Sequence, residues 1–326
     1  MKPVICNYYL TYRCNARCRF CRIWTDTTVP AAREASPDVV KRNLADVKRL
    51  GCRIVDFTGG EPLLYERLPE VLGFARKAGL LTTVTTNGIC YPERAGELTG
   101  LVSFLQFSLE SVDAENHDMV RGADSYDRVI ESIDIARSLG EHPTFGHTVT
   151  DENIDAVPEV IAFARKLNVL LFLNPCFSYF GNPGLSASNA HRLGKLARGR
   201  GVTVDRGFLR FIEDGGNHTS DPRCLAVSST VVISPDDKLI LPCYHFKTRE
   251  IPIEGRLYDL RRDPLIEEER NKEGRHPFCE GCAVNCYIRA SLYRRLDRYF
   301  LPSVLSGAKY LWEYTRLTRC PGSRRK

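Results

Sequence analysis

Three cysteines near the start of the sequence have a spacing that suits metal–sulfur chemistry. Cys14, Cys18 and Cys21 form a C-x3-C-x2-C pattern. Three thiolates on one short loop can bind one face of a [4Fe–4S] cube and leave one iron open for a bidentate small molecule, since a fully protein-ligated cube usually takes four cysteines. A zinc knuckle and three unrelated thiols are the alternatives, although zinc normally has a fourth Cys or His close by. The spacing therefore favours an iron–sulfur site.

A scaffold of alternating strands and helices must position this loop. The predicted strands are residues 4–12, 53–58, 81–86, 102–109, 144–149 and 169–174. The predicted helices between them are residues 37–50, 67–78, 92–98, 125–139 and 154–167. Six such units indicate a parallel sheet with right-handed crossovers, closed as a partial (β/α)6 barrel of the TIM type. Sites in such folds lie at the carboxyl ends of the strands, and the polar motifs of this chain follow its predicted strands.

The cysteine loop, with Phe20 before its last cysteine, resembles the signature of the radical S-adenosylmethionine (SAM) superfamily. The segment Phe57–Pro62, with the sequence FTGGEP, is similar to the GGEP motif of that family and follows the second predicted strand. The resemblance covers about residues 1–178. It implies that SAM chelates the open iron, that reduction cleaves SAM, and that a 5′-deoxyadenosyl radical takes a hydrogen atom from the substrate.

The same resemblance implies a SAM site along the ends of the second, third and fourth strands. The implied SAM-binding residues are Gly59, Gly60, Glu61, Pro62, Thr86, Asn87, Ser108 and Arg121. It names no catalytic side chain.

A second group of cysteines lies beyond residue 220. Two of them flank a predicted hairpin at residues 229–241, and three follow in a C-x2-C-x3-C pattern. This resembles the auxiliary-cluster extension of radical SAM enzymes, called SPASM in its long form and Twitch in its short form. Lys238 departs from it, because the family usually has Gly there, and the count fits one auxiliary [4Fe–4S] cluster. We expect four ligands from this group and treat Cys286 as a competing fifth; a zinc site is the alternative. The candidates are Cys224, Cys243, Cys279, Cys282 and Cys286.

Charge separates the end of the chain from the rest. The 326-residue chain has a net charge of +6, while residues 289–326 alone carry +8. Apolar residues recur at helical spacing before and after Pro302, which predicts basic amphipathic helices. Such a segment can cover the barrel or lie on an anionic membrane surface. Nucleic acid is not expected, since no stacking platform accompanies the charge.

These features predict four regions. They are a radical SAM partial barrel at residues 1–180, a helical linker at 181–220, an auxiliary-cluster region at 221–288 and a basic amphipathic helical tail at 289–326. The N-terminal segment lacks the apolar stretch of a signal peptide, and no apolar run is long enough to span a membrane. We therefore expect a cytoplasmic protein, peripheral at the membrane if the tail binds lipid.

We expect a radical SAM enzyme of oxidoreductase or transferase type that acts on a small metabolite or a lipid-linked molecule. The auxiliary cluster would assist electron transfer or substrate binding, and a flavodoxin or ferredoxin would supply electrons. One alternative is a peptide-modifying maturase that uses a separate recognition partner. The other is a non-catalytic iron–sulfur or zinc sensor.

Overall fold

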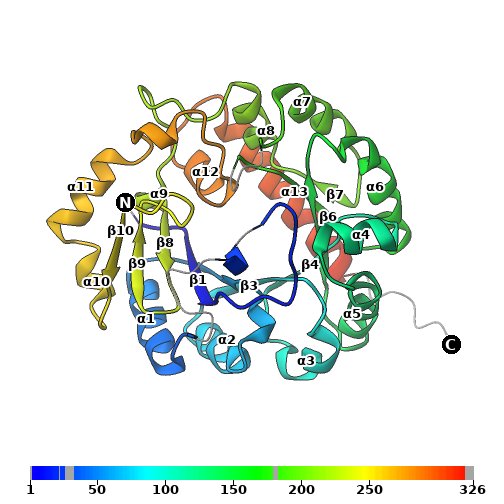
Figure 1. The fold of residues 1–326 in the computed structure, drawn as a ribbon, viewed down its shortest axis with the longest axis horizontal. Coiled ribbons are helices and arrows are strands. Elements are labelled where there is room, and N and C mark those ends of the chain that lie inside the picture. Colours follow the sequence, from blue (N-terminus) through cyan, green and yellow to red (C-terminus); the bar gives the residue numbers. More distant parts are fainter. Residues whose placement is uncertain (1, 22, 26–32, 179–182, 320–326) are drawn as a thin grey trace.

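A single curved sheet organises the molecule, with helices around its outer face (Figure 1). The computed structural model describes residues 2–21, 23–25, 33–178 and 183–319. The strand order is β10-β9-β8-β1-β2-β3-β4-β5-β6-β7, in which β1 to β8 are parallel and β9 and β10 antiparallel to their neighbours. This confirms the predicted partial barrel.

The strands are β1 (Ile5–Thr11), β2 (Ile54–Gly59), β3 (Leu81–Thr86), β4 (Phe104–Ser108), β5 (Thr144–Val149), β6 (Leu170–Pro175), β7 (Val202–Thr203), β8 (Thr230–Ile233), β9 (Lys238–Leu241) and β10 (Arg249–Pro252). The α-helices are α1 (Pro37–Arg49), α2 (Leu68–Lys77), α3 (Tyr91–Leu98), α4 (Ala114–Arg121), α5 (Tyr126–Ser138), α6 (Val157–Lys166), α7 (Ala187–Leu196), α8 (Arg206–Glu213), α9 (Ala226–Ser229), α10 (Leu257–Leu260), α11 (Pro264–Lys272), α12 (Asn285–Leu292) and α13 (Phe300–Arg319).

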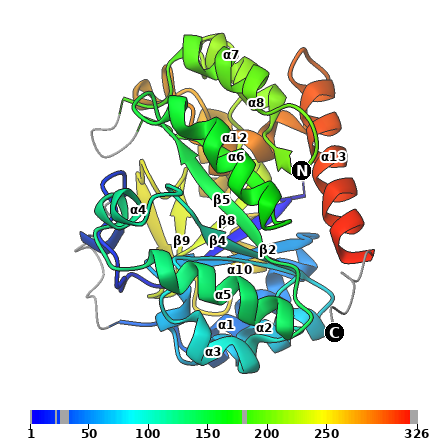
Figure 2. The same cartoon turned by 90° about the vertical axis from the view of Figure 1, so that its right-hand side faces the viewer.

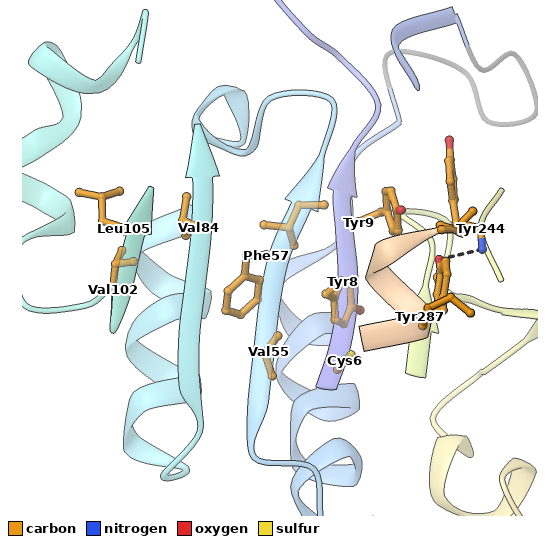
Figure 3. Packing of buried hydrophobic residues seen from close by; sticks show 14 of the residues in the cluster. Cys6, Tyr8, Tyr9, Val55, Phe57, Val84, Val102, Leu105, Tyr244 and Tyr287 are labelled. Atoms are coloured by element: carbon orange, nitrogen blue, oxygen red, sulfur yellow. Dashed lines mark hydrogen bonds between the residues drawn. The ribbon is translucent and has the colours of Figure 1, made fainter. Parts of the chain in front are cut away.

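The two faces of the central strands differ in character. On β2, Val55 and Phe57 are fully buried against the helices, as Figure 3 shows, whereas Asp56 and Thr58 on the other face are only half-buried. The same alternation continues on β3 and β4. Successive side chains of a strand point to opposite faces, so the outer face forms the core and the concave face stays open to solvent. On β3, two side chains are exposed: that of Leu81, the first residue of the strand, and that of Thr85.

The predicted hairpin extends the barrel sheet. Ile5 of β1 pairs with Thr230 of β8, and β9 and β10 continue the sheet beyond that edge. The expected auxiliary region therefore shares its sheet with the barrel. The region expected to be a helical linker also contributes a strand to this sheet, because β7 pairs with β6.

The end of the chain does not follow the predicted periodicity throughout. A break after α12 leaves Leu296 highly exposed, and α13 begins at Phe300 and continues through Pro302. Proline is tolerated there because the first helical turn has no intrahelical acceptor for its missing N–H. Residues 320–326 of the predicted tail lie outside the described residues.

Helix α13 lies along one side of the molecule (Figure 2) and packs against the sheet near the start of its strands. The ring of Tyr314 lies 5.2 Å from that of Phe104, and the ring of Tyr310 lies 5.9 Å from that of Phe172. The helix therefore covers the amino-terminal end of the concave face. Among the residues that the structure describes, none of the helices combines the length and apolar character needed to cross a bilayer.

Candidate functional site

The loop that carries the first three cysteines follows β1 and is tied to the end of α4. The backbone N–H of Arg17 donates to the carbonyl of Arg121 (2.9 Å), and that of Arg19 donates to the carbonyl of Val120 (3.0 Å). Gly122 has a φ of +60°, and a Cβ there would lie 2.7 Å from the carbonyl oxygen of Arg17. Helix α4, which is not among the helices predicted from the sequence, thus holds the cysteine loop.

The two glycines at the end of β2, Gly59 and Gly60, let the chain pack against the segment immediately before Cys14. The N–H of Gly60 donates to the carbonyl of Thr11 (2.9 Å), and the N–H of Glu61 donates to that of Arg13 (2.8 Å). A Cβ at Gly60 would lie 2.2 Å from the carbonyl oxygen of Arg13, a distance that no real contact allows. Glycine is therefore required at this position for close contact between two backbones.

Glu61 is the centre of a buried polar network. Its carboxylate accepts hydrogen bonds from the N–H of Leu63 (3.0 Å), the hydroxyl of Thr86 (2.7 Å) and the N–H of Asn87 (2.9 Å). The side-chain amide of Asn87 donates in turn to Asn15 (2.7 Å) on the cysteine loop. Burial raises the pKa of Glu61, and the three hydrogen bonds oppose that shift. The network thereby links the ends of β2 and β3 to the loop.

A buried cation lies beside the cysteine loop. Arg121 is 7% exposed, and its Nη1 lies 3.5 Å from a carboxylate oxygen of Glu110. Its Nε has no hydrogen-bond acceptor among the described residues. Burial raises the pKa of Cys14 and Cys21, and that of Cys18 to about 12, while the Arg121 guanidinium lowers all three. Arg121 is thus placed to stabilise negative charge on these sulfur atoms.

The remaining predicted SAM-binding residues lie at the same edge of the sheet. Pro62 is buried in the short turn after Glu61. Ser108 is half-buried at the end of β4, and its hydroxyl forms no hydrogen bond with another described residue. Sequence reasoning missed Asn15 and Glu110; Glu110 accepts from the N–H of Thr148 on β5 (3.0 Å). Its position directly after a strand was the available signal.

The second cysteine group divides into four residues and one. A mostly apolar pocket is lined by Cys224, Cys243, Cys279 and Cys282 together with Pro242, Phe246 and neighbouring residues. Cys286 is not part of this lining; it lies exposed on α12. Although the Cys286 side chain is open to solvent, the protein atoms around its thiol raise the pKa of Cys286 to about 11 by desolvation, and the nearby Asp56 carboxylate of β2 adds to the shift. Its thiol is therefore directed toward the concave face.

Asn217 joins the segments that carry three of these four cysteines, Cys224, Cys279 and Cys282. Its Oδ1 accepts from the N–H of Cys224 (3.1 Å), and its Nδ2 donates to the carbonyls of Gly274 (2.8 Å) and Cys279 (3.0 Å). Its backbone N–H donates to the carbonyl of Cys282 (3.0 Å). Asn217 is fully buried, and no motif in the sequence signals it.

The second cysteine group is also joined to β1. The ring of Tyr9 stacks on that of Tyr244 with centroids 4.3 Å apart, and the N–H of Tyr244 donates to the hydroxyl of Tyr287 (2.9 Å; Figure 3). Both cysteine groups therefore adjoin the same strand.

Within the described residues, no three His, Cys, Asp or Glu side chains are arranged to hold a single metal ion.

A partial parallel barrel whose first strand enters a C-x3-C-x2-C loop, and whose second strand ends in Gly-Gly-Glu-Pro against that loop, defines the radical SAM class. Residues 8–164 match the model of the Radical SAM superfamily. Residues 8–164 therefore form a radical SAM domain, and membership of that superfamily implies a [4Fe–4S] cluster and SAM.

Similar proteins have diverse names. An AdoMet-dependent heme synthase of Methanosarcina barkeri is 28% identical over 52% of this chain and 49% of its own length. A probable GTP 3',8-cyclase of Archaeoglobus fulgidus is 28% identical over 83% of this chain and 95% of its own. The chain spans about half the length of the heme synthase and of several other curated relatives that it matches.

The fold matches a solved structure of Streptococcus suis SuiB bound to its precursor peptide SuiA. The TM-score is 0.70 with 17% identity, over 92% of this chain and 74% of SuiB. At this identity the likeness establishes the fold alone.

We predict that Glu61→Gln destabilises the protein by about 1–3 kcal/mol, because the new amide N–H₂ would face a donor and leave it unpaired. Thermal unfolding of the anaerobic protein measures the effect. Glu66→Gln, at an exposed site nearby, is the control and should leave the midpoint unchanged. An equal thermal unfolding midpoint for the two variants would contradict a stabilising role of the hydrogen bonds to Glu61.

Proposed function

We propose that Cys14, Cys18 and Cys21 hold the cluster that binds SAM. The observation that supports this assignment is the backbone contact of Gly60 and Glu61 with the chain just before Cys14, because it places the ends of β1 and β2 side by side. When bound, the cluster supplies the electron that cleaves SAM and so produces the radical that abstracts hydrogen.

We assign the SAM-binding roles to the carbonyls of Gly59 and Gly60 and to Asn87, Ser108 and Arg121. Arg121 suits the SAM carboxylate, since a guanidinium can donate to it in bidentate fashion and its Nε is unpaired among the described residues. Glu61 already accepts three hydrogen bonds, so its proposed role is to orient Thr86 and Asn87, with Pro62 fixing the turn.

For the second group we propose one auxiliary [4Fe–4S] cluster bound by Cys224, Cys243, Cys279 and Cys282. This choice is supported by the pocket that the four cysteines share and by the hydrogen bonds that Asn217 donates to the carbonyls of Gly274 and Cys279. The exposed position of Cys286 toward Asp56 supports a place for its thiol near the substrate. Zinc at the same four residues is the competing assignment.

The concave face indicates the kind of substrate. Its half-buried or exposed side chains on three adjacent strands are all hydrogen-bonding groups apart from the strand-starting apolar residues; they include Asp56, Thr58, Thr83, Thr85 and Gln106. Burial raises the pKa of Asp56 to about 6, while a hydrogen bond from Thr83 lowers it. We infer a polar small molecule, or the polar head of a lipid-linked one. A peptide is the second candidate, because the fold matches that of SuiB.

We retain the four regions as a proposal about function, with residues 1–180 as the radical SAM region, 181–220 as a linker, 221–288 as the auxiliary-cluster region and 289–326 as the tail. Strands β7 and β8, which belong to the second and third regions, extend the barrel sheet. A flavodoxin or ferredoxin is the proposed electron donor.

Anaerobic reconstitution tests the central assignment. With SAM and dithionite, the wild-type protein should form 5′-deoxyadenosine, and Cys18→Ala should form none. Cys52→Ala, at a buried thiol outside both groups, is the matched control and should retain the activity. Absence of 5′-deoxyadenosine from reconstituted wild type, or its retention in Cys18→Ala, would contradict the assignment.

Iron analysis tests the auxiliary cluster. The wild type should bind about eight iron atoms per chain, and Cys243→Ala about four, because a cube holds four. Cys286→Ala should still bind about eight. Four irons with one zinc in the wild type would exclude the auxiliary cluster, and loss of iron in Cys286→Ala would make that cysteine a ligand.

Contact of the tail with a membrane remains a proposal, and α13 offers a surface for it. Leu301, Leu305 and Trp312 recur along one side of the helix and are more than half exposed. Deleting the tail would also uncover the barrel, so point substitutions are the cleaner test.

We predict that Leu305→Ser combined with Trp312→Ser weakens binding to vesicles containing anionic lipid by about tenfold, through loss of buried apolar area. Cosedimentation measures this. Leu139→Ser, at an exposed apolar site directly after α5, is the control. No wild-type binding, or equal binding by both proteins, would show that α13 only covers the barrel.

A further inference from the structure

A buried arginine lies outside the site described above and has no partner. Arg261 follows α10 and is 2% exposed. None of its Nε, Nη1 and Nη2 atoms has a hydrogen-bond acceptor within the described part of the chain, and no carboxylate lies within ion-pair distance. A guanidinium has five N–H donors, and burying an unpaired charge is costly. The protein therefore contains a set of donors that an acceptor from outside could satisfy.

Arg261 lines a pocket of about 390 Å³ that is open to solvent. Four other cations line the same pocket, and no acidic side chain does. The cations are Lys2, Arg49, Arg261, Arg262 and Arg270. Five positive groups around one opening attract anions strongly, especially where one of the five is withdrawn from water.

Contacts within the protein account for only some of these charges. Arg270 pairs with Glu267 (2.6 Å). Arg49 and Arg262 both lie over the ring of Tyr258, at 3.6 and 4.1 Å from its centroid. Cation–π contacts of this kind do not neutralise the charge of the guanidinium groups.

Two acidic groups near the pocket are engaged elsewhere. Asp46 accepts from the backbone N–H of Tyr258 (3.0 Å), and Glu273 accepts from Ser228. Glu273 attracts Arg261 only from beyond ion-pair distance. Burial and the neighbouring Arg270 lower the pKa of Arg261 to about 10, a shift in the direction expected for a cation that lacks a counter-ion.

The helix dipole of α1 explains only some of the positive charge at the rim of the pocket. Lys48 and Arg49 lie in the last turn of α1, where cations stabilise the helix dipole. That effect needs no buried guanidinium, and it gives Arg261 no acceptor. The floor of the pocket therefore needs its own explanation.

We propose that this pocket binds the phosphate group of an anionic ligand, with Arg261 as the floor and Lys2 and Arg262 at the rim. A planar guanidinium matches two phosphate oxygens in bidentate fashion. Lys2 and Pro3 precede β1, and Arg49 and Leu50 precede β2, so the pocket lies at the amino-terminal end of these strands. It is thus at the opposite end of β1 from the cysteine loop and separate from the SAM site.

Titration of the reconstituted full chain tests the site. The probes are inorganic phosphate and pyrophosphate, each compared with sodium chloride at equal ionic strength, and the readouts are calorimetry and the thermal unfolding midpoint. The wild type should bind, and Arg261→Met should weaken binding at least about tenfold, as expected for loss of a charged hydrogen bond. Arg256→Gln, an exposed residue outside the lining, is the control and should bind normally.

Two further arms make the result decisive. If Arg261→Met does not fold, Arg262→Gln and Lys2→Gln at the rim should each weaken binding.

Vesicles of phosphatidylcholine with phosphatidic acid identify the source of the phosphate. Binding of the soluble anions supports a free ligand, and Arg261-dependent binding of vesicles alone supports a lipid headgroup. If neither probe binds better than chloride, or if the floor and rim variants bind like the wild type, the proposal is wrong. These readouts do not depend on SAM cleavage.

Discussion

The close contact between the end of β2 and the chain after β1 is the constraint on which the first cysteine site depends. Two backbone hydrogen bonds join Gly60 and Glu61 to Thr11 and Arg13, and no side chain fits at Gly60. A short loop with little regular structure can be held firmly in this way, because its first residues are hydrogen-bonded as if they continued a sheet. The neighbouring network around Glu61 then extends this order to the end of β3.

The same strand relates the two cysteine groups. The first group follows β1 directly, and the second adjoins it through the stack of Tyr9 on Tyr244 and the pairing of β1 with β8. Helix α12, which carries Cys286, belongs to the second group and yet places its thiol toward Asp56 on the concave face. The C-terminal part of the chain is therefore both a wall of the barrel and the holder of the second cysteine pocket.

The sequence predicted the repeated parts of the fold well and the irregular parts poorly. Six strands and their helices followed from apolar periodicity, which reflects burial directly. Helix α4 was missed because its segment AENHDMVR is polar and has only two buried residues, His117 and Arg121. The break after α12 was missed because Leu296 continues the helical spacing although it is exposed.

The candidate site shows the same division. Cysteines and the Gly-Gly-Glu-Pro segment were found because their types and spacing are rare, and the structure brings their neighbours together. Asn15, Glu110 and Asn217 were missed, since each acts by hydrogen bonds to residues far away in the sequence. Local patterns carry no information about such partners. The pocket around the buried Arg261 was missed for the same reason.

The pairing of β1 with β8 has a consequence for synthesis on the ribosome. Thr230, where β8 begins, follows Thr11, where β1 ends, by 219 residues. At about 5–20 residues per second, β1 has an open edge for roughly 10–45 s after it emerges. That edge carries the apolar segment ICNYYLT, and exposed edges of this kind pair readily with other chains. The nascent barrel is thus most vulnerable to aggregation before its C-terminal part is made.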